Sequence, residues 1–76
     1  MKSGKDLVAI EVLEAIKNNP RITPLEIAEV IKTSAQYVRN TLRVLTELEL
    51  VETPVRGVYL ITDFGKEVLN RLEKKS

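Results

Sequence analysis

Four polar side chains with hydrogen-bonding groups suited to DNA base edges recur at helical spacing in the middle of the chain: Gln36, Arg39, Asn40 and Arg43. A guanidinium can bond guanine O6 and N7 in a bidentate fork, and a side-chain amide can bond adenine N6 and N7. The opposite side of the same helix would carry Val38, Leu42 and Leu45. The pattern therefore predicts an amphipathic helix that packs on a core by one face and exposes base-reading groups on the other.

Groups suited to phosphate contacts flank this set. Ser34 would cap the start of the helix, where unpaired backbone N–H groups favour an anion, and Lys32 and Thr33 lie in the turn before it. In the first helical turn, Ala35 and Tyr37 are placed to touch a thymine methyl group or a phosphate. We therefore predict a contact surface that begins in the turn and continues along the helix.

The same side chains also have simpler roles. Arg43 can pair with Glu47 one turn later on an ordinary solvated face, which would stabilise the helix by only about 0.3–0.5 kcal/mol. Tyr37 is equally suited to packing with its hydroxyl group in water. DNA contact is favoured for the cluster as a whole, because residues 30–46 include basic residues and no acid.

The composition limits the other classes of function. The chain has 76 residues, 43% hydrophobic and 30% charged, which indicates one globular domain over residues 1–76. It has no cysteine and no histidine, so we expect no metal, no cofactor and no enzymatic activity. It has no apolar run of membrane-spanning length, so we expect a soluble, cytoplasmic protein. The net charge is only +1, so affinity for nucleic acid would come from a local cluster.

The elements that would position the cluster begin with a helix over about residues 6–18, capped by Ser3 or Asp6. The spacing predicts that its core face consists of Ala9, Val12, Leu13 and Ile16. Leu7 and Ile10 fall beside that face. They are either scattered surface apolar residues or part of a contact between two copies of the chain.

A helix-turn-helix unit is predicted over about residues 24–49. Thr23 and Glu26 form a capping box around Pro24, which suits the first helical position. The second helix of the unit starts after Ser34 and ends around Glu49. Its core-facing side is predicted to consist of Val38, Thr41, Leu42, Leu45 and Leu48. A short helix that supports a second, solvent-facing basic helix is suited to a DNA major groove.

Two short strands follow, over residues 50–53 and 58–61. Arg56 and Gly57 suit a tight hairpin between them, because glycine readily takes a positive φ. Arg56 at the tip of this ribbon can insert into a minor groove or can simply aid solubility.

Thr62 then caps a last helix over about residues 63–74, whose predicted apolar stripe consists of Phe64, Val68, Leu69 and Leu72. The chain is thus mainly α with a small β-ribbon, in the order helix, helix, helix, strand, strand, helix.

Several motifs in this order resemble winged helix-turn-helix proteins. The core spacing Ile27-Ala28-x-x-Ile31-x-x-Ser34-x-x-x-Val38-x-x-x-Leu42-x-x-Leu45 resembles that of bacterial and archaeal winged-helix regulators. Leu50-Val51 resembles the leucine-valine entry into the first wing strand of such proteins. Tyr59-Leu60-Ile61-Thr62-x-x-Gly65 is similar to a strand-to-helix segment of the multiple-antibiotic-resistance and phenolic-acid regulator families. Lys32 and Glu49 occupy positions where these families usually have glycine.

The resemblance implies a sequence-specific double-stranded DNA-binding transcriptional regulator. In such proteins the third helix enters the major groove, and the short wing, residues 50–61 here, lies at the backbone or minor groove. Because one small domain contacts only part of an operator, we expect a homodimer. Leu7, Ile10 and the outer side of the C-terminal helix are the predicted interface.

Two other functions are consistent with the fold. A winged helix can serve as a protein–protein interaction module of a transcription or assembly complex, which the near-neutral charge favours. Such a module is expected to expose an apolar patch on the third helix or the wing. A single-strand or RNA binder would need a platform of exposed aromatic residues, and the chain has few aromatic residues.

Overall fold

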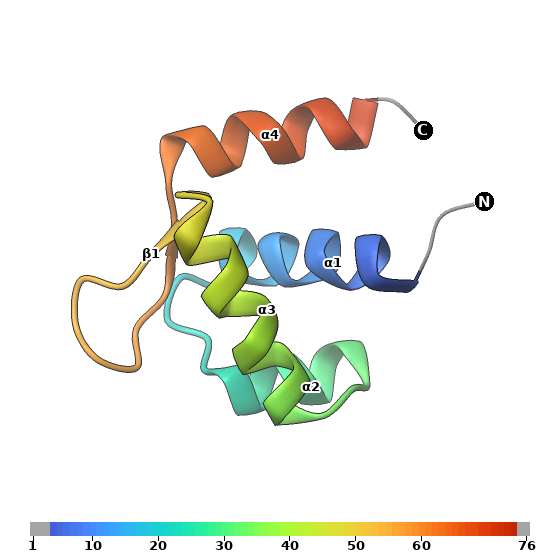
Figure 1. Cartoon of the computed structure of the whole chain (residues 1–76), viewed down its shortest axis with the longest axis vertical. Helices are drawn as coiled ribbons and strands as arrows, with labels where there is room; N and C mark the ends of the chain where they lie inside the picture. Colours follow the sequence, from blue (N-terminus) through green and yellow to red (C-terminus); the bar gives the residue numbers. More distant parts are fainter. Residues whose placement is uncertain (1–3, 75–76) are drawn as a thin grey trace.

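The computed structural model describes the backbone of residues 4–74 and the side chains of residues 8–74 (Figure 1). In chain order its elements are α1 (Gly4–Asn18), α2 (Pro24–Ile31), α3 (Ala35–Glu47), β1 (Val51–Glu52), β2 (Leu60–Ile61) and α4 (Asp63–Lys74). The predicted order and the mainly helical class are therefore confirmed. Within the described part of the chain, the helices are too short or too polar to cross a membrane.

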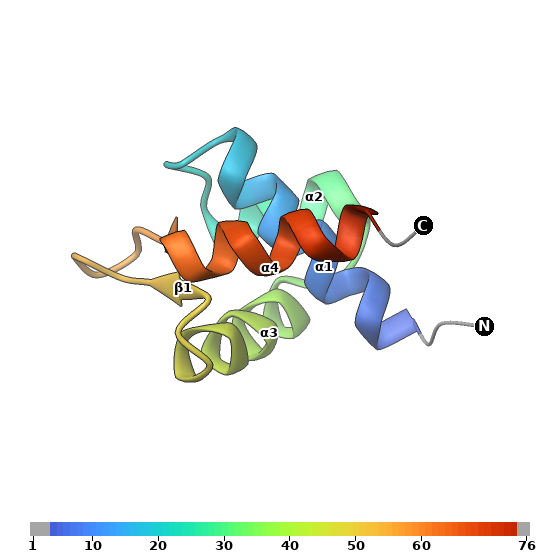
Figure 2. The same cartoon turned by 90° about the horizontal axis from the view of Figure 1, so that it is seen from above.

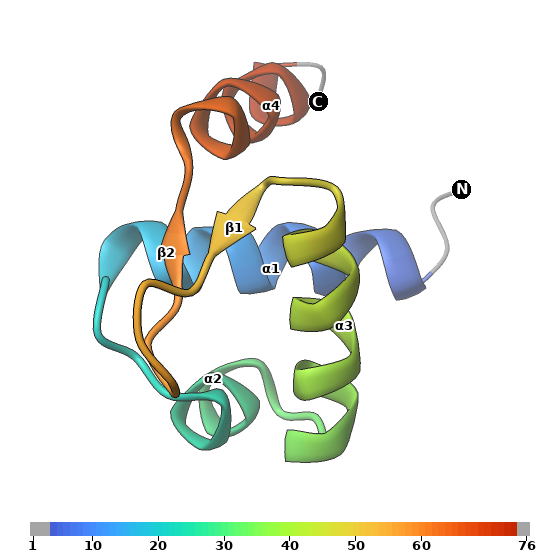
Figure 3. The same ribbon diagram turned by 60° about the vertical axis from the view of Figure 1, so that its left-hand side comes forward.

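Helix α1 lies at the centre of the molecule. It contacts α2, α3, α4 and β2, and Figure 1 shows α4 on one side of it and the α2–α3 pair on the other. Seen from above in Figure 2, α4 lies over α1. Figure 3 shows the two strands side by side in front of α1, with α3 to the right of the strands. The core consequently forms where all these elements meet α1.

The core contains only apolar side chains among the described residues. Its fully buried members come from every helix and from β1: Val12, Leu13, Ile16, Ile27, Val38, Leu42, Val51 and Leu69. Burial of each such side chain stabilises the fold by roughly 1.5–3 kcal/mol before entropy is counted. Of the residues predicted to face the core from the third helix, Val38, Leu42 and Leu45 are buried, Thr41 is half-buried and Leu48 is exposed.

One threonine joins the end of α3 to the start of α4. The Thr62 hydroxyl donates to the Glu49 carbonyl at 2.7 Å and accepts from the Gly65 N–H at 2.9 Å, so it caps α4 as predicted. The Thr62 N–H donates to the Leu50 carbonyl at 3.0 Å. A Cβ at Gly65 would collide with that same carbonyl oxygen and with Ile61. Thr62 and Gly65 are therefore both needed for the first turn of α4 to pack closely against Leu50, the residue before β1.

Two non-glycine residues in the left-handed region terminate the helices of the helix-turn-helix unit. Lys32 has φ 60° and ends α2, while Glu49 has φ 65° and follows α3. The Lys32 N–H donates to the Ala28 carbonyl, as glycine does in a helix C-cap. The chain therefore adopts at these positions the backbone geometry that glycine favours.

The ribbon is shorter than predicted. Val51 pairs with Ile61 and Glu52 with Leu60 in antiparallel register, and residues 53–59 form a loop. The Leu50 N–H donates to the Leu45 carbonyl at 2.9 Å and so closes the end of α3 instead of joining the ladder. Gly57 has φ 84°, as predicted.

Four expectations about single residues were wrong. Helix α1 begins at Gly4, so Asp6 lies within the helix and does not cap it. Ile10 is half-buried and packs on the core instead of falling beside it. Leu48 is 57% exposed at the C-cap of α3, and Phe64 is 54% exposed because Gly65 takes the inward position in the first turn of α4. Ser3 and the Leu7 side chain lie outside the described residues.

Candidate nucleic-acid interface

Local hydrogen bonds fix the start of each helix in the helix-turn-helix unit. The Thr23 hydroxyl accepts from the Glu26 N–H at 3.2 Å, and the Glu26 carboxylate accepts from the Thr23 N–H at 2.9 Å, which completes the predicted capping box. Ser34 caps α3 by accepting from the Tyr37 N–H at 3.1 Å. Each cap is worth about 1 kcal/mol, so the orientation of α3 is set locally as well as by its core face.

The four side chains predicted to read bases are all brought to the outer face of α3. Gln36, Arg39, Asn40 and Arg43 are exposed, while Val38, Leu42 and Leu45 are buried on the opposite side. Gln36 Nε2 donates to Asn40 Oδ1 at 3.1 Å. One face of α3 therefore presents two guanidinium groups and two amides to solvent.

The charges of the two arginines are not neutralised by nearby acids. Among the described residues, the ion pair joins Arg71 to Glu67 on α4, with 3.0 Å between Nη2 and Oε2. The alternative pairing of Arg43 with Glu47 does not form within that part of the chain. Arg39 and Arg43 are thus available to an external anion or to base acceptors.

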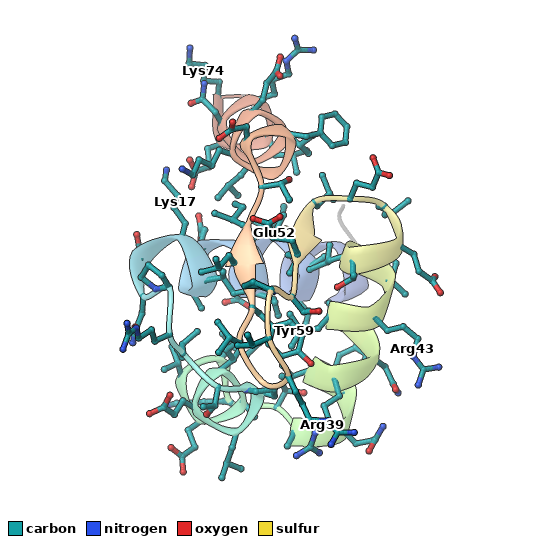
Figure 4. The ribbon with its side chains drawn as sticks, turned by 90° about the vertical axis from the view of Figure 1, so that its left-hand side faces the viewer. Lys17, Arg39, Arg43, Glu52, Tyr59 and Lys74 are labelled. Carbon is teal, nitrogen blue, oxygen red and sulfur yellow. The ribbon has the colours of Figure 1, made fainter. Side chains whose placement is uncertain are left out.

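A hollow of about 360 Å³ lies between α3 and the wing. From α3 it is lined by Arg39, Arg43, Thr46 and Glu47, and from the wing segment by Thr53 and Tyr59. In Figure 4 the two arginines extend from α3, and Tyr59 comes from the neighbouring wing. The two guanidinium groups and three hydroxyl groups of the hollow can receive the sugar–phosphate backbone beside a groove, whereas the Glu47 carboxylate on the same lining would repel a phosphate.

Thr46, Thr53 and Tyr59 are absent from the sequence-based set. Thr46 lies one turn after Arg43 on the flank of α3 that meets the wing, so the helical wheel held a signal for it. Its hydroxyl donates to the Leu42 carbonyl at 2.7 Å and keeps an acceptor lone pair. Thr53 and Tyr59 join the site only because the wing loop lies beside α3, a contact between distant parts of the chain that the local sequence pattern does not specify.

The remaining predicted contacts differ in exposure. Lys32 is exposed in the turn, whereas Thr33 is half-buried. Ala35 is half-buried and packs against the core, and Tyr37 is half-buried on α3. Arg56 is exposed in the turn where the Val58 N–H donates to the Val55 carbonyl at 3.1 Å. Lys32 and Arg56 therefore keep free charged ends on either side of α3, and Ala35 serves mainly in packing.

The other flank of α3 borders an apolar hollow of about 330 Å³ between α1, α3 and α4. Ile10, Val44, Leu48, Val68 and Leu72 are among its lining residues, and among residues 8–74, whose side chains the structure describes, no charged residue lines it. Val44 and Leu48 are each more than half exposed on α3. Helix α3 thus separates a polar, basic surface from an apolar one.

A pair of acids lies away from both surfaces, between α1 and α4. A side-chain hydrogen bond with Glu73 raises the pKa of Glu14 above its usual value of 4.5, and burial raises it further. Because the proton is shared between two carboxyl groups, this contact is stronger when one of them is protonated. The pair affects stability and does not contribute to the α3 surface.

Comparison with known structures agrees with this architecture. A MarR family protein of Mycobacterium tuberculosis superposes with a TM-score of 0.81 at 22% identity, over 90% of this chain and 51% of the other. A Listeria innocua protein of unknown function superposes with a TM-score of 0.78 at 29% identity, over 88% of this chain and 50% of that one. The chain therefore spans about half the length of these similar proteins.

The same fold also occurs inside an enzyme. An O-methyltransferase from neocarzinostatin biosynthesis matches with a TM-score of 0.69 at 28% identity, over 84% of this chain but only 21% of its own. No curated protein sequence matches the chain. Residues 5–52, which are more than half of the chain and include α2, α3 and the turn between them, match the family described as winged helix-turn-helix DNA-binding. The chain thus belongs to the winged helix-turn-helix DNA-binding family.

Proposed function

We propose that this chain is a cytoplasmic, sequence-specific regulator of transcription that binds double-stranded DNA with α3 in the major groove. The observation that carries the proposal is the outer face of α3, where Arg39 and Arg43 have no acidic partner in the described part of the chain and lie beside two exposed amides. Family membership supports DNA as the ligand. In this arrangement the arginines bond guanine edges and the amide pair reads an adenine edge.

The wing adds contacts outside the base edges. The hollow between α3 and the wing receives the phosphate backbone, with Thr53 and Tyr59 as hydroxyl donors. Arg56 at the wing turn reaches the backbone or the minor groove, and Lys32 contacts the phosphate nearest the helix-turn-helix turn. The net charge of +1 requires this local placement, because no general excess of positive charge draws the chain to DNA.

Binding to a labelled short duplex over a range of salt concentrations tests the proposal. Log affinity is expected to fall linearly with log salt, with a slope near −0.9 for each phosphate contacted. On duplexes selected by the wild-type protein from random sequence, Arg39→Ala or Arg43→Ala should each weaken binding by about 1–3 kcal/mol. Arg71→Ala is the matched control, because it removes the same charge from the exposed side of α4. Equal affinity of all three variants, or no salt-dependent binding, would refute the proposal.

A homodimer is part of this proposal. One copy measures 33 Å along its longest axis, close to one turn of B-DNA at about 34 Å, so it covers about one half-site. The second copy covers the apolar hollow beside α3, where Ile10 meets Val68 and Leu72 of α4 and where Val44 and Leu48 are exposed. Each copy has both the hollow and protruding apolar side chains at its rim, as a two-fold contact requires.

Sedimentation of the wild-type chain tests the dimer. A two-fold dimer is expected at micromolar concentration, and Leu48→Lys should shift it to monomer without unfolding, because Leu48 is more than half exposed. A monomeric wild-type chain at high micromolar concentration would refute this part.

A protein-interaction module is the second candidate. The exposed apolar residues Val44 and Leu48 on α3 and Val55 in the wing loop favour it. The O-methyltransferase match shows the fold within a protein with another activity. The two candidates differ in the salt experiment, since an interaction module predicts no salt-dependent affinity for duplex DNA.

A further inference from the structure

The hydrogen bond between Gln36 and Asn40 gives one part of the α3 surface a fixed orientation. Gln36 Nε2 donates to Asn40 Oδ1 at 3.1 Å, and the two residues are one helical turn apart on the exposed face. Arg39 and Arg43, by contrast, have no side-chain hydrogen bond within the described residues. The free protein therefore presents an ordered amide pair next to two unrestrained guanidinium groups.

This bond determines which hydrogen-bonding groups Asn40 has left. Its oxygen has two lone pairs, of which one accepts from Gln36, and both of its N–H groups are free. The free edge of Asn40 thus offers one acceptor and one donor side by side. Adenine presents the complementary pair in the major groove, N6–H as donor and N7 as acceptor, whereas guanine presents two acceptors.

From this geometry we propose that Gln36 is a positioning residue that holds Asn40 in the orientation for adenine, so that the amide pair specifies an A·T base pair in the site. The inference rests on the proposed function, in which α3 reads base edges. Asn40 makes the base contact, and Gln36 acts through Asn40. The bond also removes rotamer freedom from Asn40 before DNA arrives, which lowers the entropy lost on binding.

Atom-specific base analogues test the contact. Duplexes are first selected from random sequence with the wild-type protein, and each adenine of the selected site is then replaced in turn by 7-deazaadenine, which lacks the N7 acceptor. At one position the replacement should weaken wild-type binding about tenfold, within the range of a good bidentate contact. Binding by Asn40→Ala should not respond to the replacement at that position.

Two substitutions at Gln36 separate positioning from simple contact. Gln36→Ala releases Asn40, so discrimination between A·T and G·C at that position should fall several-fold. Gln36→Glu cannot donate to Asn40 Oδ1 and instead accepts from its amide nitrogen, which turns the amide over. The Gln36→Glu variant should therefore prefer A·T over G·C at that position less strongly than the Gln36→Ala variant does. Gln36 and Asn40 are exposed, and circular dichroism melting checks that each variant stays folded.

The outcomes distinguish this inference from the proposed function. If no position responds to 7-deazaadenine, or if both Gln36 variants keep wild-type discrimination, the inference is overturned while DNA binding stands. If the wild-type protein shows no salt-dependent duplex binding, both fail together. Two results together would establish that Gln36 positions Asn40. Binding by Asn40→Ala would not respond to 7-deazaadenine, and Gln36→Glu would discriminate less between A·T and G·C than the wild-type protein.

Discussion

Replacement of Lys32 by glycine is expected to stabilise the fold and to weaken DNA binding at the same time. Lys32 ends α2 with φ 60°, in the left-handed region. That region costs an L-residue roughly 1–2 kcal/mol, and a glycine there loses about 0.5–1 kcal/mol more backbone entropy on folding. The difference predicts that Lys32→Gly raises the free energy of unfolding by about 0.5–1 kcal/mol, or roughly 2–8 °C in Tm for a domain of this size.

DNA binding should change in the opposite direction. Lys32 is exposed in the turn before α3, so its ammonium group is placed to neutralise one phosphate. Its loss should reduce the slope of log affinity against log salt by about 0.9. Lys32→Asn removes the charge but keeps a residue that tolerates the left-handed region, so it should weaken binding without the full gain in Tm.

Glu49→Gly is the matched control. Glu49 has φ 65°, is exposed and follows the other end of α3, so the same gain in Tm is expected with no loss of DNA affinity. Thermal melting followed by circular dichroism and salt-dependent fluorescence anisotropy supply the two measurements. A fall in Tm for both glycine variants would show that the strain argument is wrong. An unchanged salt slope in both Lys32 variants would show that the turn does not contact a phosphate.

Three further predictions concern other parts of the fold. Gly65→Ala should destabilise the domain by about 1–3 kcal/mol in urea unfolding, because its Cβ would meet the Leu50 carbonyl oxygen. Glu14→Gln should raise the Tm near neutral pH, where Glu14 and Glu73 repel. Because the pKa of Glu14 is raised in the folded protein, the wild-type pair is most stabilising below the unfolded value of 4.5 and loses that stability as pH rises through the raised pKa. The gain in Tm over wild type should therefore shrink as pH falls toward 4.5 and change no further below it. Val44→Lys should dissociate the proposed dimer, as is expected for Leu48→Lys, and sedimentation of the variant checks that the same hollow is involved.

The parts of the fold that depend on neighbouring residues could be predicted from the sequence. The caps at Thr23, Ser34 and Thr62 involve groups within three residues, and the structure forms all three. The outer face of α3 follows from helical periodicity alone. Its DNA contacts stay predictions, which the duplex-binding experiments test.

The parts that depend on distant contacts could not be predicted. Leu48 fits the apolar side of the helical wheel, but it is the C-cap residue of α3 and is exposed, with Val44, at the apolar hollow between α1, α3 and α4. Phe64 fits the stripe of α4, but the close approach of Gly65 to Leu50 turns the helix so that Phe64 faces out. Tyr59 joins the α3 surface only because residues 53–59 curve back toward that helix.

The hydrogen bond from Thr62 to Glu49 allows the length of the wing loop to change without a change in the rest of the fold. These residues are 13 positions apart in the chain, and their contact closes the base of the ribbon independently of the loop beyond it. A change in the length of loop 53–59 therefore leaves the helix-turn-helix unit and the α4 packing intact. Doubling the length of such a loop costs only about 0.6 kcal/mol in closure entropy. The reach of the wing can therefore be engineered, or can diverge, almost without cost to the stability of the domain.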